Sequence, residues 1–211
     1  MKKSVKTCLL AGAHLFACCL LFLLAAGIFL LDAHSQEPGK RFNERSWTQY
    51  SQVVFLVLSG LCFAYGAYVN RARFVPAVLL TGMAALGAVR ELDYDFDRVV
   101  HGFWKVPAAV VVAVALACVW KRRHTLFDAF AHEVKKTYWG VLCAGFGIVF
   151  VFSRLFGMRR NWEALLDGRG PLTTNIRRLA EEGTELAGYA LIFLAAAGFL
   201  LSCLRERREQ R

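Results

Sequence analysis

The sequence contains none of the short motifs that mark common catalytic sites. It has no H-E-x-x-H segment, no G-x-S-x-G elbow and no P-loop. Each of these motifs places a nucleophile, a metal or a phosphate in a fixed local geometry. Their absence argues against the enzyme classes that they define.

The cysteines are few and poorly placed for cross-linking. All seven fall inside apolar segments rather than in the loops between them, and no two form a C-x-x-C pair. Disulfide frameworks and zinc sites both depend on such spacings. We therefore interpret these cysteines as small apolar packing residues.

Ionisable residues are scarce at the centres of the apolar segments. A transport path normally leaves charged groups or broken helices near the membrane midplane, so an ion carrier is the weakest functional hypothesis. His14 is the only histidine within such a segment, which gives no support to haem ligation by a histidine pair. The basic residues are not interleaved with aromatic ones as in a nucleic-acid groove, so we expect no nucleic-acid partner.

What the sequence does contain is apolar blocks. Hydrophobic residues make up 57% of the 211 positions, and a membrane span needs roughly 20 such residues in a row. We predict an all-α transmembrane bundle in contact with membrane lipid, forming a single integral membrane domain over residues 1–211. About six spans are expected, at residues 8–31, 50–69, 74–92, 103–120, 138–156 and 184–204.

The first and third spans are the least ordinary. The first follows a basic amino terminus, but its apolar run is too long for the roughly 7–15 residues of a signal peptide, so we predict a retained signal anchor. The third, from Phe74 to Val89, reaches only about 24 Å at 1.5 Å per residue. We expect it to be the shortest span and to borrow residues up to Leu92.

Charge in the loops sets the expected orientation. With six spans, both termini lie on one side, and the loops of that side carry slightly more than half of the 26 lysines and arginines and the whole net charge of +10. The positive-inside rule favours that side as cytoplasmic. We therefore predict a multi-pass protein of the bacterial inner membrane with both termini in the cytoplasm.

One inner loop has a helical pattern of its own. Residues 121–136 are too polar to span, but Leu126, Phe127, Phe130 and Val134 recur at helical spacing. This pattern predicts an amphipathic helix lying on the cytoplasmic leaflet. His132, within it, is expected to be solvated.

Carboxylates gather on the outer side, between the third and fourth spans. In a helix, Asp93, Asp97 and His101 share one face at i, i+4 and i+8. Such a face is able to hold a divalent cation or to run acid–base catalysis. The alternative is that nearby basic residues, among them Arg90 and Arg98, simply neutralise these acids at the membrane rim.

A second group of ionisable residues lies at the start of the last span. Glu182, Glu185 and Tyr189 share a helical face, with Glu185 in the first membrane turn. Arg154, near the outer end of the fifth span, is placed to snorkel to the headgroups or to pair with the acids of the 90s. These groups form one site only if the third, fourth and sixth spans meet.

Polar residues also mark the outer end of the second span. Ser46, Gln49 and Gln52 are spaced three apart and share a helical face. They either point into the bundle or lie at headgroup level, and the headgroup interpretation is the favoured one.

These residues give two groups of site candidates. The predicted metal ligands, of which the last three are also catalytic candidates, are Asp93, Asp97, His101 and Glu185. The candidates for binding a phosphate headgroup through guanidinium groups are Arg159, Arg160, Arg177 and Arg178.

Two functional hypotheses follow. The favoured one is an accessory or binding subunit, whose charged outer site docks a membrane or periplasmic partner. The alternative is a metal-dependent hydrolase or transferase that acts on a lipid or lipid-linked substrate at the outer leaflet.

Overall fold

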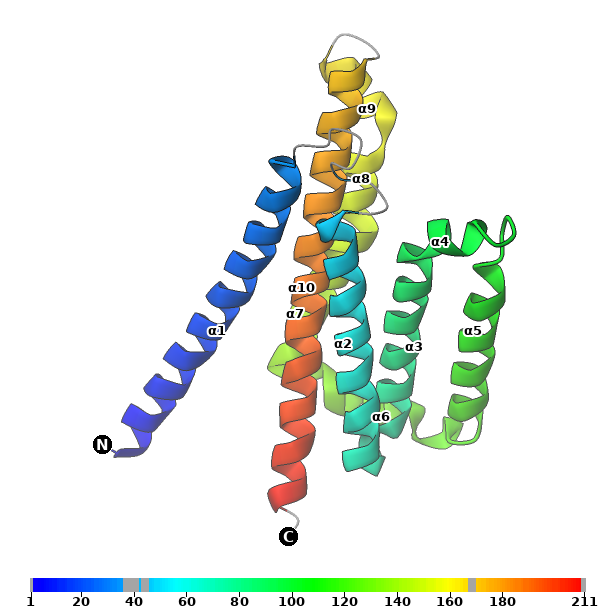
Figure 1. Ribbon diagram of the computed structural model, residues 1–211. Helices are drawn as coiled ribbons and strands as arrows, with labels where there is room; N and C mark the ends of the chain where they lie inside the picture. The colour runs from blue at the N-terminus through cyan, green and yellow to red at the C-terminus, as the bar shows by residue number, and fades with distance from the viewer. Residues whose placement is uncertain (1, 36–41, 43–45, 167–169, 210–211) are drawn as a thin grey trace.

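A computed structural model describes residues 2–35, 42, 46–166 and 170–209. In chain order, its helical elements are α1 (Lys2–Ala33), α2 (Trp47–Val69), η2 (Arg71–Arg73), α3 (Phe74–Glu91), α4 (Asp93–Asp97), α5 (Lys105–Trp120), η3 (Arg123–Thr125), α6 (Leu126–Val134), α7 (Thr137–Gly147), η4 (Ile148–Ser153), α8 (Arg154–Gly157), α9 (Arg159–Leu165) and α10 (Pro171–Glu209). These described residues contain no strand, so the predicted all-α bundle is confirmed (Figure 1).

Five helical segments are long and apolar enough to cross a membrane. They are Ala11–Ala33, Trp47–Val69, Arg71–Glu91, Thr137–Gly157 and Pro171–Glu209. The helix α5 corresponds to the fourth predicted span, but its 16 residues cover only about 24 Å at 1.5 Å per residue.

The expectation that the third span is the shortest is wrong. The turn η2 runs directly into α3 and gives a segment of 21 residues, Arg71–Glu91. The helix α5, at the fourth predicted span, is shorter and is not among the five segments long enough to cross a membrane. The chain before it turns through residues 98–104, with Gly102 at a positive φ of 82°, a conformation that favours glycine. Figure 1 shows α5 beside α3, and both chain termini at the same end of the bundle.

The long helix α10 is the centre of the bundle. The helices α2 and α7 pack along it (Figure 1), and Phe199 of α10 is fully buried with its ring 5.4 Å from that of Phe63 on α2. The helices α7 and α10 approach closely at Gly145, where an added Cβ would lie 3.1 Å from the backbone oxygen of Gly188. Small residues permit such approaches between helices in membranes.

The helix α6 lies within the segment for which we predict an amphipathic helix. Its two faces differ sharply, since the side chain of Phe127 is 84% exposed while Glu133 is fully buried. The pattern therefore predicts the helix correctly, but not the burial of an acidic residue on its inner face.

The helix α1 is attached to the bundle by the start of α2. The carboxylate of Asp32, which is 3% exposed, accepts hydrogen bonds from the backbone N–H groups of Trp47 (3.0 Å) and Thr48 (2.6 Å). The first N–H groups of a helix have no acceptor within it. Asp32 supplies that acceptor from a different helix and fixes the corner between α1 and α2.

Removing this carboxylate should loosen the corner. We expect Asp32→Ala to lower the free energy of unfolding by about 0.5–2 kcal/mol, as for other lost helix caps. Amide hydrogen exchange at Trp47 and Thr48 should accelerate at the same time. The matched control is Asp95→Ala on α4, whose side chain is 45% exposed; equal effects of the two substitutions would contradict this role of Asp32.

Candidate functional site

A polar cavity of about 220 Å³ lies at the end of the bundle opposite the two termini. We call it the charged cavity. The elements that contribute most to it are α10 and α3, and α2, α4 and α8 contribute one residue each. It is lined by Phe42, Gln49, Arg90, Glu91, Asp93, Arg154, Arg177, Arg178, Glu181, Glu182 and Glu185.

Glu185 is the most deeply buried carboxylate of the charged cavity. It is 5% exposed and accepts hydrogen bonds from the Ser153 hydroxyl (2.6 Å) and from Nη2 of Arg154 (2.9 Å). Arg154 thus pairs with the last span rather than with the acids of the 90s. An ionised carboxylate at such depth needs partners of this kind.

Local backbone geometry accompanies these two donors. The chain forms a π-helix at η4 (Ile148–Ser153) before it continues as α8. Such wide turns are uncommon and frequently lie at functional sites. Ser153 ends the π-helix and Arg154 follows it, so both donors to Glu185 come from this irregular segment.

Two further carboxylates are held by neutral donors. Glu91 accepts from Nε2 of Gln49 (3.0 Å) and from the Tyr189 hydroxyl (2.6 Å), so α3 and α10 meet at this point. Glu182 accepts from Nε2 of Gln52 (3.0 Å). Gln49 is 9% exposed and Gln52 is fully buried. The favoured headgroup-level interpretation of these glutamines is therefore wrong, because both point into the bundle.

The four arginines of the charged cavity fall into two kinds. Arg154 pairs with Glu185, and Arg177 pairs with Glu181 at 2.5 Å while also donating to the Gly157 carbonyl oxygen at 3.4 Å. Arg90, which is exposed, and Arg178, which is half-buried, form no hydrogen bond or ion pair with another residue that the structure describes. The cavity thus holds two guanidinium groups without an acceptor in the described chain.

The predicted metal ligands separate into two places. Asp93 and Glu185 line the charged cavity, whereas Asp97 and His101 do not. Nδ1 of His101 lies 3.4 Å from Oδ2 of Asp97, and the histidine side chain is 98% exposed. The face predicted over Asp93, Asp97 and His101 does not form, because α4 ends at Asp97 and the chain turns before it reaches His101.

No group of three or more His, Cys, Asp and Glu side chains comes together in metal-binding geometry within residues 2–35, 42, 46–166 and 170–209. Of the predicted headgroup arginines, Arg177 and Arg178 line the charged cavity. Arg159 and Arg160 instead lie exposed on α9. Two residues of each predicted set thus line the charged cavity, and their predicted roles in metal and headgroup binding stay predictions.

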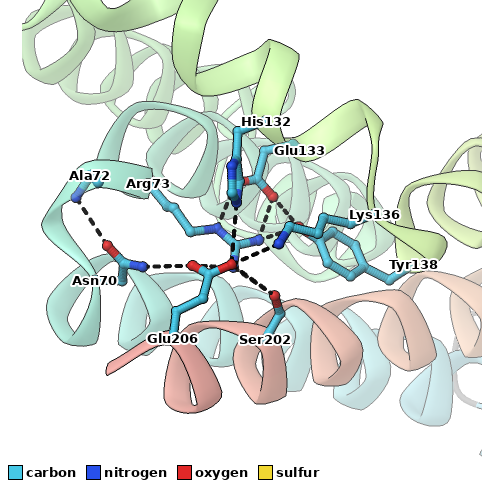
Figure 2. A network of polar contacts seen from close by, with 9 residues as sticks. All are labelled: Asn70, Ala72, Arg73, His132, Glu133, Lys136, Tyr138, Ser202 and Glu206. Carbon is cyan, nitrogen blue, oxygen red and sulfur yellow. Dashed lines mark hydrogen bonds and ion pairs between the residues drawn. The ribbon is translucent and has the colours of Figure 1, made fainter. Parts of the chain in front are cut away.

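A second polar cluster, the Arg73 network, lies at the other end of the bundle (Figure 2). Arg73 is 2% exposed and donates to both carboxylate oxygens of Glu133, at 2.6 and 2.5 Å. The Tyr138 hydroxyl contacts both residues. This bidentate and almost fully buried ion pair joins the start of α3 to α6.

Glu206 on α10 extends the Arg73 network. It accepts from Nδ2 of Asn70 (2.9 Å) and from Nζ of Lys136 (2.7 Å), and it lies 3.2 Å from Nε2 of His132. The side chain of His132 is 48% exposed, so it is solvated as predicted from the sequence, and it also contacts Glu206. Because its buried ion pair is matched within the chain, we assign the Arg73 network a structural role.

Neither Arg73 nor Glu133 is among the site candidates that the sequence predicts, because both lie in polar connections between the apolar segments. Comparisons with protein-family models, with curated proteins and with solved structures found no match. The structure shows a helical bundle with five segments long and apolar enough to cross a membrane, which is compatible with a membrane protein, and a charged cavity at the end of the bundle opposite its termini.

Proposed function

We propose that this is a binding protein of the membrane whose charged cavity takes the phosphate group of a ligand. The observation that carries the proposal is the pair Arg90 and Arg178, which line the cavity and have no acceptor among the described residues. The carboxylates Glu91, Glu182 and Glu185 already accept hydrogen bonds from the protein. Glu181 pairs with Arg177, and Asp93 is the fifth carboxylate of the lining. Arg90 and Arg178 are therefore the donors that the cavity can offer to a ligand rich in acceptors.

Phosphate matches these donors in shape and charge. Guanidinium groups bind phosphate oxygens through paired, charge-assisted hydrogen bonds. The volume of about 220 Å³ is below the roughly 300–1,000 Å³ of pockets for drug-sized molecules. The charged cavity thus suits a small charged head better than a large organic ligand.

A metal-dependent hydrolase or transferase receives less support from this geometry. That hypothesis needs Asp97, His101 and Glu185 around one reacting centre. Instead, Asp97 accepts from the backbone N–H of Gly102 at 2.8 Å, away from the cavity that Glu185 lines. Binding is therefore the better-supported function.

The proposal includes a cellular setting. We place the protein in a bacterial inner membrane as a multi-pass subunit, with both termini cytoplasmic and the charged cavity facing the periplasm, where an accessory subunit would meet a membrane or periplasmic partner. Support comes from the clusters 121–123 and 135–136, which are basic and belong to the end of the bundle that carries both termini.

The test removes the two unpaired arginines together. Purified protein is titrated with phosphatidylglycerol and with soluble glycerol phosphate while thermal unfolding is followed. A ligand at 100 times its Kd stabilises a protein by about 2.7 kcal/mol. We expect at least one probe to stabilise the wild type in this way, and Arg90→Gln/Arg178→Gln to lose that stabilisation.

The matched control is Arg159→Gln/Arg160→Gln, which removes the same charge from α9, outside the charged cavity. It should respond to the probes as the wild type does. If neither probe stabilises the wild type, or if both double variants respond alike, the proposal is wrong.

A further inference from the structure

An apolar cavity of about 260 Å³ lies beside the charged cavity, among α2, α3, η4 and α10. Its walls include Leu56, Leu80, Met83, Phe150 and Ile192. Met83 is 41% exposed and Phe150 is 57% exposed, and both lie in segments long and apolar enough to cross a membrane. The cavity therefore opens on the flank of these helices, the side that would face acyl chains in a membrane.

The apolar cavity and the charged cavity meet at one place. Arg90 lines both of them. Tyr189 lines the apolar cavity, and its hydroxyl donates at 2.6 Å to Glu91 of the charged cavity. An apolar chain of a ligand in one cavity would thus lie next to a charged group of the same ligand in the other.

This adjacency points to an amphiphile. A soluble phosphate compound would use only the charged cavity and leave the neighbouring apolar walls without a partner. Moving an acyl chain from water to an apolar site is favourable, but moving it there from lipid gains little. Selectivity for a lipid ligand therefore depends on the headgroup contacts, and the apolar cavity must have room for the chain when the headgroup is bound.

We infer that the ligand is a phospholipid, with its phosphate in the charged cavity and one acyl chain in the apolar cavity. This inference rests on the proposed function, because it identifies the class of ligand for the same site. Arg90 lies where the phosphate group in the charged cavity would connect to the acyl chain in the apolar cavity. The lipid enters from the membrane, past Met83 and Phe150, and not from the aqueous phase.

The experiment blocks the apolar cavity and leaves the charged cavity intact. Met83→Trp places a bulky ring on the wall, and the control Leu58→Trp places the same ring on α2 outside the cavity, at a residue that is 39% exposed. Binding of phosphatidylglycerol and of its soluble headgroup, glycerophosphoglycerol, is measured by titration of the purified protein. If Met83→Trp does not fold, Leu86→Trp on the same wall replaces it.

We expect Met83→Trp to weaken binding of phosphatidylglycerol by about tenfold or more, a loss that corresponds to about 1.4 kcal/mol. Leu58→Trp should bind as the wild type does, and the soluble headgroup should bind all three proteins weakly. If Met83→Trp binds the lipid like the wild type, or if the soluble headgroup binds as tightly as the lipid, the inference fails while the proposed phosphate site stands. If Arg90→Gln/Arg178→Gln also binds like the wild type, both fail.

Discussion

Arg73→Ala is expected to lower the free energy of unfolding by about 3–5 kcal/mol, the usual cost of removing one partner of a buried ion pair. The reason is that Glu133 is fully buried and would lose both of its hydrogen bonds to the guanidinium group. Chemical unfolding of the purified protein in detergent measures the change. The matched control is Arg71→Ala, an exposed arginine of the same turn, which should change stability by less than about 1 kcal/mol.

The double variant Arg73→Met/Glu133→Met separates charge from packing. Replacing a whole buried ion pair with apolar residues of similar volume is often neutral or stabilising. We therefore expect the double variant to recover most of the stability lost in Arg73→Ala. If Arg73→Ala unfolds like the wild type, or if the double variant is less stable than Arg73→Ala, the Arg73 network does not hold α3 on α6.

The second large effect concerns the contact between α7 and α10. A Cβ at residue 145 would lie 2.8 Å from Cγ1 of Ile192 and 3.1 Å from the backbone oxygen of Gly188. Because a backbone atom moves only with its helix, we expect Gly145→Ala to lower the free energy of unfolding by about 1–3 kcal/mol, the cost of overpacking.

Gly147→Ala provides the control for this contact. It is the same substitution two residues later, and nothing lies within 4 Å of an added Cβ there. Alanine in an open helical position should raise stability by about 0.5–1 kcal/mol. Opposite signs for the two substitutions support close packing of α7 on α10, whereas equal changes would contradict it.

Helix positions could be predicted well from the sequence because apolar runs depend only on local composition. The exception is the relative length of the third and fourth predicted spans. The length of the third depends on η2, where Asn70 accepts a hydrogen bond from the backbone N–H of Ala72 and the turn runs on into α3. The length of the fourth depends on the turn at Gly102. Both lengths are set by the turns that precede the helices, and hydropathy does not describe the geometry of a turn.

The candidate site could be predicted only in part. The shared face of Glu182, Glu185 and Tyr189 follows from helical spacing, and all three lie at the junction of α10 with its neighbours. The predicted face that includes His101 would require a helix that continues to His101, but α4 ends at Asp97. Helical spacing extends a pattern only as far as the helix itself continues.

The Arg73 network was missed for a different reason. Arg73 and Glu133 belong to segments that hydropathy marks as polar connections, and their burial depends on how α3, α6 and α10 assemble. A residue at i+4 from the buried Ala129 lies on the inner face of α6. That spacing is the local signal for the burial of Glu133, and it carries no information about Arg73 as the partner of Glu133.

The most direct test of the central claim is native mass spectrometry of the protein released from detergent micelles, with bound phospholipid counted for each variant. We expect the wild type and Arg159→Gln/Arg160→Gln to retain one phospholipid molecule per chain, and Arg90→Gln/Arg178→Gln to lose it. Equal retention by all three proteins would show that Arg90 and Arg178 do not bind the ligand, and it would contradict the assignment of the charged cavity as a phosphate site.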